Sequence, residues 1–428
     1  MDATETLSDR GRELAKNNIR DKFSAMFSDV YDAGTNPNGF VNLGVSENYI
    51  MTEEVAEFAT RKHEAAAKTF TYGEGPWGSE RLRKAMANHM NKHFKPFEPV
   101  DANDIIFANG VTALCEMLGF SIAEPGDGIL MSRPIYQAFQ SDFGTKAHVR
   151  CVFTSFGDVD QFSPAAVSKY EEALVAAESS GTRVRALLLC HPHNPLGQCY
   201  PESTIVGLMK LCQKYKIHLL VDEIYAASVY EIPDKNALPF TSSLAFDSSP
   251  YIDANLLHLL YGLAKDFACG GLRLGCFWTR NSALRAAMSS IGQFHWSGAS
   301  NETVATHMLE DQAWLEEFLA TSRSRLAHNN KLTRQLLDEQ GIEYHTGANA
   351  GFFIWVDLRP YLAKTGASDG WAAEKKLLES MLARKVYIND GESLSAEEPG
   401  WFRIVFSQEE RTLREGLRRV FEAIRSGE

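Results

Sequence analysis

Short apolar runs alternate with helix-like stretches along the middle of this chain. The runs at 105–107, 128–132, 184–190 and 217–221 are each long enough for one buried strand. Alternation of this kind predicts a largely parallel sheet that is covered by helices on both faces. Because ligands of such sheets bind beyond the carboxyl ends of the strands, the residues at those ends are the first candidates for a functional site.

The character of the sequence changes after about residue 300. A long polar region from Asn301 to Gln340 reads as helical, and shorter strand-like runs follow it. These runs predict a second, smaller α+β unit, for which a chain of 428 residues has room. We expect the chain to divide into an N-terminal arm with part of the small domain (1–70), a large domain (71–300) and a small domain (301–428).

Helix boundaries can be read at several places. Residues 52–69 and 80–93 have helical patterns, and Ser407 with Glu410 has the spacing of a capping box at the start of the last helix. The apolar positions of that helix recur at helical spacing and predict its buried face: Leu413, Leu417, Val420, Phe421 and Ile424.

Composition excludes several classes of protein. The formal net charge of −12 argues against a nucleic-acid-binding surface. No stretch approaches the ~20 apolar residues of a membrane-spanning helix, and the first residues lack the apolar core of a signal peptide. The seven cysteines are scattered, without a CxxC pair, so neither a disulfide framework nor a zinc site is indicated. We expect a cytoplasmic protein.

One lysine, Lys265, follows the apolar run Leu256–Tyr261 and a turn of small residues. Burial at a strand end lowers the pKa of a lysine and makes its amine a nucleophile towards carbonyl groups. Arg273, further along the same stretch, has the planar guanidinium that holds anions in a fixed geometry. A surface lysine in a loop is the alternative. A carbonyl-reactive lysine beside an anion clamp points to pyridoxal phosphate.

Two further strand ends carry groups that suit other parts of the same ligand. The helix that begins at Val111 offers free amides, the hydroxyl of Thr112 and the positive end of its dipole to an anion. Asp222 closes a buried apolar run, where an unpaired carboxylate is costly. Opposite a pyridinium nitrogen the carboxylate is paired, with an attraction of about 4 kcal/mol at about 4 Å in an effective dielectric near 20.

Other polar and aromatic residues near strand ends fit the same ligand. Tyr225 lies one helical turn after Asp222, and Asn194 lies in an Asn-Pro-Leu-Gly turn. Each can hydrogen-bond a phenolic ring oxygen. Tyr136 is placed to stack on an aromatic ring or to be an ordinary core tyrosine.

Two other patterns suggest different ligands but have little support. Gly73, Gly75 and Gly78 spell the GxGxxG of a dinucleotide site, yet no strand precedes them, so we interpret the segment as a turn. His191 and His193 suggest a metal pair, but nothing else stands at ligand spacing. We predict no metal site.

Taken in order, these residues resemble the fold-type I pyridoxal-phosphate enzymes of the class I/II aminotransferase group. Within it the chain is most similar to the 1-aminocyclopropane-1-carboxylate synthase-like branch, and the resemblance covers nearly the whole sequence. The motifs that carry it are GVSENYI (44–50), ANGVTALCE (108–116), EPGDGILMSRPIYQAF (124–139), HPHNPLG (191–197), VDEIYA (221–226), LAKDF with GLRLG (263–275), NAGFFIWVDL (349–358) and EPGWFRIVFS (398–407). It implies an α/β fold whose large domain has a mostly parallel seven-stranded sheet, joined to a smaller α+β domain.

The resemblance also implies roles around the ring of pyridoxal 5'-phosphate. Lys265 would form the Schiff base and later move the Cα proton. Asp222 would pair with the pyridine nitrogen, and Tyr225 and Asn194 with the ring hydroxyl. Tyr136 would stack on the ring.

The resemblance assigns the phosphate and the substrate as well. Thr112, the amides of Val111 and Ala113, and Arg273 would hold the phosphate, together with Tyr72 from the second subunit of a homodimer with shared sites. Arg403 would grip the substrate α-carboxylate bidentately, with Asn194 beside it. Family enzymes usually place serines where this chain has Gly262 and Ala264, which puts one phosphate contact in doubt.

The expected activity is that of a pyridoxal-phosphate-dependent aminotransferase acting on an α-amino acid. The first alternative is a lyase of the same fold, by γ-elimination to a cyclopropane amino acid or by C–S cleavage in secondary metabolism. A non-catalytic cofactor-binding regulator is the alternative from another class. Glu47 is the candidate that selects between the reactions, with a surface or capping glutamate as its alternative. Tyr49 and the insertion Pro76-Trp77 depart from the synthase pattern and favour transamination.

Overall fold

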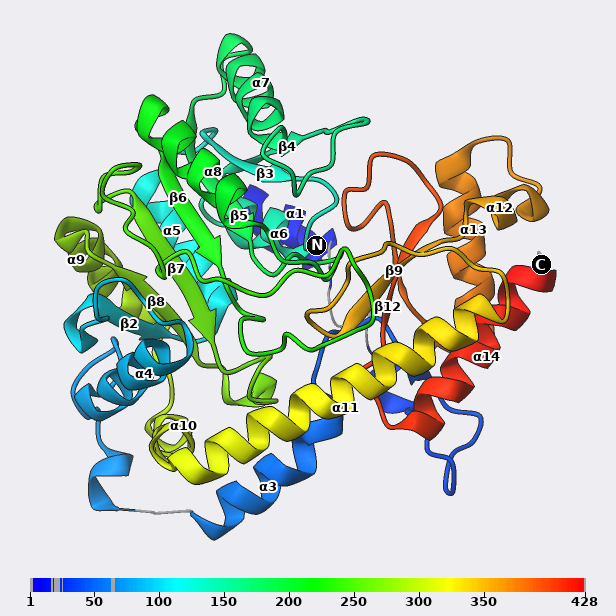
Figure 1. The fold of residues 1–428 in the computed structure, drawn as a ribbon, viewed down its shortest axis with the longest axis horizontal. Coiled ribbons are helices and arrows are strands. Elements are labelled where there is room, and N and C mark those ends of the chain that lie inside the picture. Colours follow the sequence, from blue (N-terminus) through cyan, green and yellow to red (C-terminus); the bar gives the residue numbers. More distant parts are fainter. Residues whose placement is uncertain (1–2, 17, 19–23, 25, 63–65, 427–428) are drawn as a thin grey trace.

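A seven-stranded sheet occupies one side of the molecule and a small three-stranded sheet the other (Figure 1). The computed structural model describes residues 3–16, 18, 24, 26–62 and 66–426. Among these residues, no helix combines the length and the apolar character needed to cross a membrane.

The large sheet has the strand order β2-β8-β7-β6-β5-β3-β4. Its strands coincide closely with the apolar runs of the sequence: β2 (Ile105–Ala108), β3 (Gly128–Ser132), β4 (Arg150–Thr154), β5 (Val184–Cys190), β6 (His218–Asp222), β7 (Leu257–Gly262) and β8 (Gly275–Thr279). β8 runs antiparallel to both of its neighbours, and every other pair is parallel. The prediction of a mostly parallel seven-stranded sheet is therefore confirmed.

Helices cover both faces of this sheet. Successive side chains of a strand point to opposite sides, and the apolar ones on each side are buried against helices. On β6, Leu219 and Val221 face one core, and Leu220 faces the other. The first core is shared with α4 (Glu80–His93), α7 (Ala166–Ser179), α8 (Glu202–Tyr215) and α10 (Ala299–Glu310). The second is shared with α5 (Val111–Ile122), α6 (Ala138–Gly144) and α9 (Ser282–Ile291).

The small sheet has the antiparallel order β11-β12-β9. Its strands and helices are β9 (Phe353–Asp357), β11 (Asn389–Asp390), β12 (Trp401–Val405), α12 (Arg359–Leu362), α13 (Gly370–Ala383) and α14 (Glu410–Ser426). The five apolar residues predicted for the buried face of α14 are all buried. The exact division of the chain at residues 70 and 300 stays a prediction.

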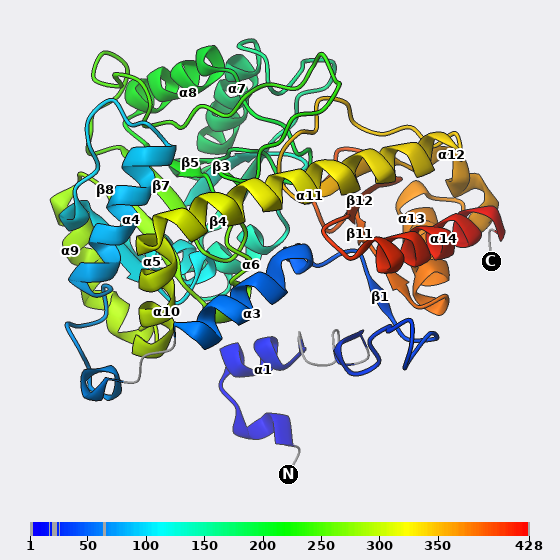
Figure 2. The same ribbon diagram turned by 60° about the horizontal axis from the view of Figure 1, so that its bottom comes forward.

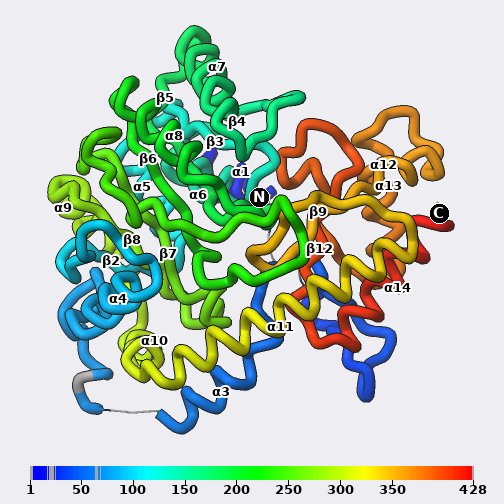
Figure 3. The backbone as a smooth tube through the Cα atoms, viewed as in Figure 1, coloured from blue at the N-terminus to red at the C-terminus, as the bar shows by residue number. Residues whose placement is uncertain are grey.

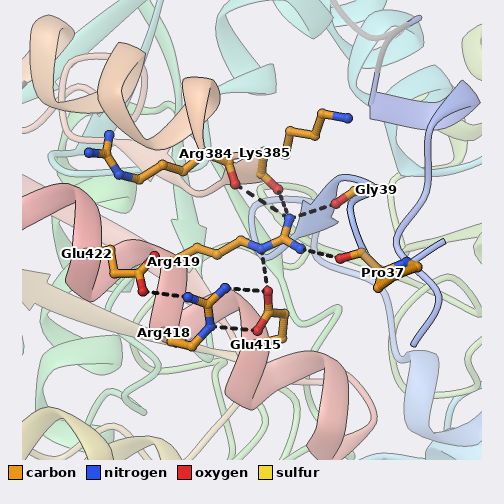
Figure 4. A network of polar contacts seen from close by, with 8 residues as sticks. All are labelled: Pro37, Gly39, Arg384, Lys385, Glu415, Arg418, Arg419 and Glu422. Atoms are coloured by element: carbon orange, nitrogen blue, oxygen red, sulfur yellow. Dashed lines mark hydrogen bonds and ion pairs between the residues drawn. The ribbon is translucent and has the colours of Figure 1, made fainter. Parts of the chain in front are cut away.

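The N-terminal part of the chain joins this small unit. β1 (Val41–Asn42) pairs in parallel with β10 (Val386–Tyr387), and the segment before it lies beside α14 (Figures 1 and 3). Arg419 of α14 is buried and donates to the carbonyls of Pro37, Gly39 and Lys385 (Figure 4). One side chain thus ties the last helix to the entry of the chain into β1.

Earlier still, α1 (Asp9–Lys16) buries none of its residues and lies apart from the main body in Figure 2. The long helix α11 (Gln312–Asp338) runs from the large unit to the small one (Figures 1 and 2).

Three of the expected boundaries are wrong or incomplete. The helical region 301–340 is broken at Asp311, whose side chain accepts from the Trp314 amide and so caps α11 as a separate helix. The helix expected at 52–69 is α3 (Thr52–Arg61), followed by a 3-10 turn at Ala67–Phe70; residues 63–65 lie outside the described residues. The capping box is absent because the Ser407 hydroxyl donates to the Glu47 carbonyl instead, and α14 begins only at Glu410.

Candidate active site

A cavity lies at the carboxyl end of the parallel strands, where most of the predicted site residues meet. Of the predicted set, it is lined by Val111, Thr112, Tyr136, Asn194, Asp222, Tyr225, Lys265 and Arg273. They come together because β2, β3, β5, β6 and β7 all end at this edge, whereas the antiparallel β8 starts there, just after Arg273.

Lys265 sits in the turn after β7 and reaches the segment that follows β1. Its Nζ donates to the carbonyl oxygen of Ser46. Burial, reinforced by the positive charge of Arg403, lowers the pKa of Lys265 to about 8, although Glu47 and Asp222 act in the opposite direction. An appreciable fraction of free amine is therefore present near neutral pH, which is the reactive form towards a carbonyl.

Asp222 ends β6 and points into the same cavity. Burial raises the pKa of this carboxyl group to about 7, and the Ile224 amide, which donates to Oδ1 at 3.2 Å, lowers it in part. Among the described residues, this is the one hydrogen bond that the Asp222 side chain makes. A buried carboxyl group needs more hydrogen-bond donors than this to offset the loss of water. It would be stabilised as the anion by a cationic partner inside the cavity.

Arg403 extends from β12 and is only 1% exposed. Its guanidinium donates to Asn194 Oδ1 at 2.7 Å, to the Gly44 carbonyl at 2.8 Å and to Asn389 Oδ1 at 2.7 Å. Its Nε has no partner among the described residues. Arg403 therefore joins the small sheet to Asn194, which lines the cavity from the β5 side.

The phenol of Tyr225 is also held from the segment after β1. Its hydroxyl lies 3.1 Å from Ser46 Oγ, and its ring packs edge-on against Phe352 and Phe353. Burial raises its pKa, so the phenol stays protonated and able to donate. Tyr136 also lines the cavity.

The N-terminus of α5 and Arg273 form the anion-binding end of the cavity. Gly110 precedes the helix with φ of 90°, and no side chain caps the first amides of α5. A Cβ on Gly110 would lie 2.6 Å from the Arg273 guanidinium, and the positive φ of this residue also favours glycine. Likewise a Cβ on Gly262 would lie 2.7 Å from the Leu274 carbonyl, so a serine would not fit there without movement of the chain.

Four predicted residues are not part of the cavity lining: Ala113, in the first turn of α5, Arg403, which reaches Asn194 from β12, Tyr72 and Glu47. Tyr72 is 86% exposed and sits with Trp296, at a ring distance of 5.5 Å, beside a separate cavity of about 1030 Å³. Glu47 is half-buried near the glycine pair, with Oε1 about 3.3 Å from the Cβ position of Gly270. Tyr49 hydrogen-bonds to Glu47, and the two lie in the segment that also carries Ser46.

Sequence reasoning missed several polar groups of the site. Ser46 contacts both Lys265 and Tyr225, and its place beside Glu47 in a quoted motif was a usable signal. Asn389 supports Arg403 from a short strand whose pattern showed nothing unusual. Asp142 lines the cavity, and burial raises the pKa of its carboxyl group to about 7 although Thr112 hydrogen-bonds to it.

The two histidines that suggested a metal pair have other partners. Nε2 of His191 lies 2.9 Å from the Thr241 carbonyl, and Nε2 of His193 lies 3.0 Å from Ser132 Oγ. Among the described residues, no three potential metal ligands come together.

The geometry can be compared with known proteins. A family model described as aminotransferase class I and II matches residues 38–420. The chain belongs to this family. Members of this aminotransferase family use pyridoxal phosphate, which is therefore the cofactor that the residues of the cavity must fit.

Similar proteins carry two kinds of name. This aminotransferase-family chain is 30% identical over 429 residues to 1-aminocyclopropane-1-carboxylate synthase-like protein 1 of Takifugu rubripes, covering 98% of the chain and 67% of that relative. It is 30% identical over 409 residues to 1-aminocyclopropane-1-carboxylate synthase 4 of Oryza sativa subsp. japonica, covering 90% and 82%.

Solved structures of aminotransferases share the fold. The kynurenine aminotransferase of Pyrococcus horikoshii superposes with a TM-score of 0.77 at 20% identity, covering 99% of this chain and 98% of that one. A double mutant of Thermus thermophilus aspartate aminotransferase gives 0.72 at 21% identity, covering 97% and 99%. The predicted fold class is confirmed.

The residues of the cavity fit pyridoxal phosphate. A phosphate suits the uncapped amides of α5 and the nearby guanidinium of Arg273. A pyridinium nitrogen suits the under-satisfied carboxyl group of Asp222, and an aldehyde suits the free amine of Lys265. Each functional part of the cofactor thus has a complementary group at this edge of the sheet.

Proposed function

We propose that this chain catalyses pyridoxal-phosphate-dependent transamination of an α-amino acid. The observation that carries the proposal is that Lys265 and Arg403 reach the same short segment. The amine donates to the Ser46 carbonyl, and the guanidinium donates to the Gly44 carbonyl at 2.8 Å. A proton-transferring amine and a carboxylate-binding guanidinium thus contact carbonyls two residues apart, close enough for the charge of Arg403 to lower the pKa of Lys265, as binding of the Cα and carboxylate of one amino acid requires.

Pyridoxal phosphate, when bound, supplies an aldehyde for the amine and a ring that takes up the electron pair released at the substrate Cα. In the proposal, Lys265 holds and moves the Cα proton at Nζ. Asp222 keeps the ring nitrogen protonated through its carboxylate. The Tyr225 hydroxyl and the Asn194 amide orient the ring oxygen, and Tyr136 bounds one face of the ring.

The phosphate of the cofactor and the α-carboxylate of the substrate have separate partners in the proposal. Thr112, the amides of Val111 and Ala113, and Arg273 hold the phosphate, in a geometry favoured by the α5 dipole. Arg403 binds the substrate α-carboxylate and gains an anionic partner when it does so. Before that, its three hydrogen-bond acceptors are all uncharged.

We also infer that the enzyme is a homodimer in which Tyr72 serves the site of the second subunit. Tyr72 is 86% exposed and forms an aromatic surface patch with Phe70 and Trp296, which line the same cavity, and the exposed Phe294 lies two residues before Trp296 in the sequence. An exposed aromatic patch of this kind marks a protein interface more often than a free surface.

Transamination is favoured over cyclopropane formation by the state of Glu47. The hydrogen bond from Tyr49 occupies this carboxylate and weakens its attraction for a cationic group of a substrate.

A single-turnover experiment tests the proposed reaction. Purified enzyme loaded with pyridoxal phosphate is mixed with one amino acid at a time, in the absence of any 2-oxo acid. We expect the visible absorbance to change to that of pyridoxamine phosphate, with one 2-oxo acid released per site. Repeated turnover that yields ammonia or a thiol without an added acceptor would contradict transamination.

That second outcome would support a lyase, the second candidate function. The position of Glu47 favours it, because its charge acts on Lys265 and its Oε1 lies about 3.3 Å from the Cβ position of Gly270. Relatives named as 1-aminocyclopropane-1-carboxylate synthases, at 30% identity, point the same way. A mouse relative at 27% identity is named as probably inactive, so the absence of both reactions would support the regulator instead.

A further inference from the structure

A buried carboxylate follows the candidate catalytic lysine directly. Asp266 is 1% exposed, and its Oδ1 accepts from Ser228 Oγ at 2.6 Å. Its Oδ2 accepts from the Ala227 amide at 2.8 Å and from the Tyr261 hydroxyl at 2.9 Å. All three donors are uncharged, and the described residues form no ion pair with this carboxylate. Burying a carboxylate without a cationic partner is costly, so the contacts that it makes call for an explanation.

The three donors come from two segments that carry the site. Tyr261 belongs to β7, the strand that leads into the turn of Lys265. Ala227 and Ser228 end the turn that carries Asp222 and Tyr225, and the Ser228 amide donates to the Tyr225 carbonyl at 3.0 Å. The carboxylate of Asp266 therefore fastens the lysine turn to the turn that holds the partners of the cofactor ring.

The hydrogen bonds around Asp266 have one consistent arrangement. Because the Tyr261 hydroxyl donates to Asp266, it accepts from Nε2 of His89, which lies 3.3 Å away. Nδ1 of His89 is then the bare nitrogen, in agreement with its lack of a partner among the described residues. Burial lowers the pKa of His89 well below its ordinary value, so the ring is neutral and fixes the phenol in its donating orientation.

We propose that Asp266 is a positioning residue that sets where the Lys265 amine stands relative to Asp222 and Tyr225. A lysine side chain has four rotatable bonds, so the placement of its backbone decides which atoms Nζ can reach. Locking the neighbouring side chain on three donors removes the freedom of that backbone. A displacement of about 1 Å at a reacting group costs on the order of 100-fold in rate.

The positioning role of Asp266 depends on the proposed transamination only for its expected effect on kcat and KM. Asp266→Asn keeps the size of the side chain but leaves one acceptor oxygen where three donors now share two, so the present set of hydrogen bonds cannot be kept. We expect the visible circular dichroism of the lysine-bound cofactor to change and kcat to fall by about 10- to 100-fold. KM for the amino acid should stay within about threefold, because Arg403 is untouched.

Glu223→Gln is the matched control. Glu223 is equally buried, and it accepts from Ser242 Oγ and from the Ser243 amide, both at 2.7 Å, outside the lysine turn. We expect a comparable loss of thermal stability with unchanged circular dichroism and kcat. Ser228→Ala, which removes one donor only, should move the circular dichroism in the same direction as Asp266→Asn by a smaller amount, and it provides the test if Asp266→Asn does not fold.

Two results would overturn the positioning role. One is Asp266→Asn enzyme that loses stability but keeps the wild-type circular dichroism and kcat per bound cofactor. The other, where Asp266→Asn does not fold, is Ser228→Ala enzyme with the wild-type spectrum. The circular dichroism requires no amino acid, so it decides the question even if the wild-type enzyme transaminates none of the substrates offered.

Discussion

At the scale of single residues, Arg403 carries a positive charge that no carboxylate of the described residues pairs. It is almost fully buried, and the groups that accept from it are two amide oxygens of side chains and one backbone carbonyl. Burial lowers its pKa, and Nε is left without an acceptor among the described residues. A carboxylate that reached Arg403 would therefore meet a desolvated guanidinium with an unused donor, which supports the proposed preference for α-amino acids.

Arg403→Lys should weaken substrate binding while leaving cofactor binding intact. An ammonium replaces the bidentate fork, and a charged hydrogen bond contributes about 1.5–3 kcal/mol. We expect KM for every active amino acid to rise by roughly 10- to 100-fold, with normal visible absorbance of the bound cofactor. Arg334→Lys is the control, because Arg334 also donates to a carbonyl, that of Ala348, but lies away from the cavity. Equal KM values for the wild type and Arg403→Lys would show that Arg403 does not bind the carboxylate.

At the scale of elements, two neighbouring arginines of α14 have opposite surroundings (Figure 4). The side chain of Arg419 is 7% exposed and contacts carbonyls from two other segments as well as Glu415. That of Arg418 is 53% exposed and pairs with Glu415 and Glu422 within its own helix. Only the first of them connects the helix to the rest of the fold.

Arg419→Met should therefore destabilise the protein far more than Arg418→Met. The first change strips buried carbonyls of a charged donor and should cost about 3 kcal/mol of the free energy of unfolding. The second removes surface ion pairs and should cost less than about 1 kcal/mol. Denaturant titration of both variants, followed by far-UV circular dichroism, measures the difference. Similar losses in the two variants would mean that the carbonyls of Pro37, Gly39 and Lys385 do not depend on Arg419.

The sequence was informative wherever a local rule decided the structure. The apolar runs became the strands of the large sheet, and the residues at their ends became the cavity, because parallel strands bring their carboxyl ends to one edge. The capping box failed because Ser407 had a competing partner, the Glu47 carbonyl, that is distant in sequence. Asp266 was missed for the same reason: its three donors are visible only after β7 and the turn of Tyr225 have been placed side by side.

At the scale of the whole molecule, the exposed aromatic patch beside Tyr72 is the feature that a single chain does not explain. Phe294 is largely exposed, although burying a side chain of this size contributes about 1.5–3 kcal/mol. The patch borders the large cavity that the loop at 71–75 forms with Trp296. A second copy of the chain would cover this apolar surface and bring Tyr72 to the neighbouring site.

Phe294→Glu should accordingly separate the proposed dimer. A charge introduced two residues before Trp296 would be left unpaired in an apolar interface, so we expect sedimentation at the mass of one chain and weaker retention of pyridoxal phosphate. Phe97→Glu changes an exposed phenylalanine outside this patch and should sediment like the wild type. Wild-type protein that already sediments as a monomer would contradict the shared site.

The pairing of β1 with β10 has a consequence for how this protein is made. Gly44 and Ser46, which receive Arg403 and Lys265, leave the ribosome long before β10 and β12, because the whole large sheet lies between them in the sequence. Until then the large sheet can form, but the Ser46 carbonyl is not yet held beside Lys265, and the guanidinium of Arg403 is not yet in place. A nascent chain can therefore form the wall of the cavity in advance, but the Ser46 carbonyl and Arg403 join it only after β1 has paired with β10.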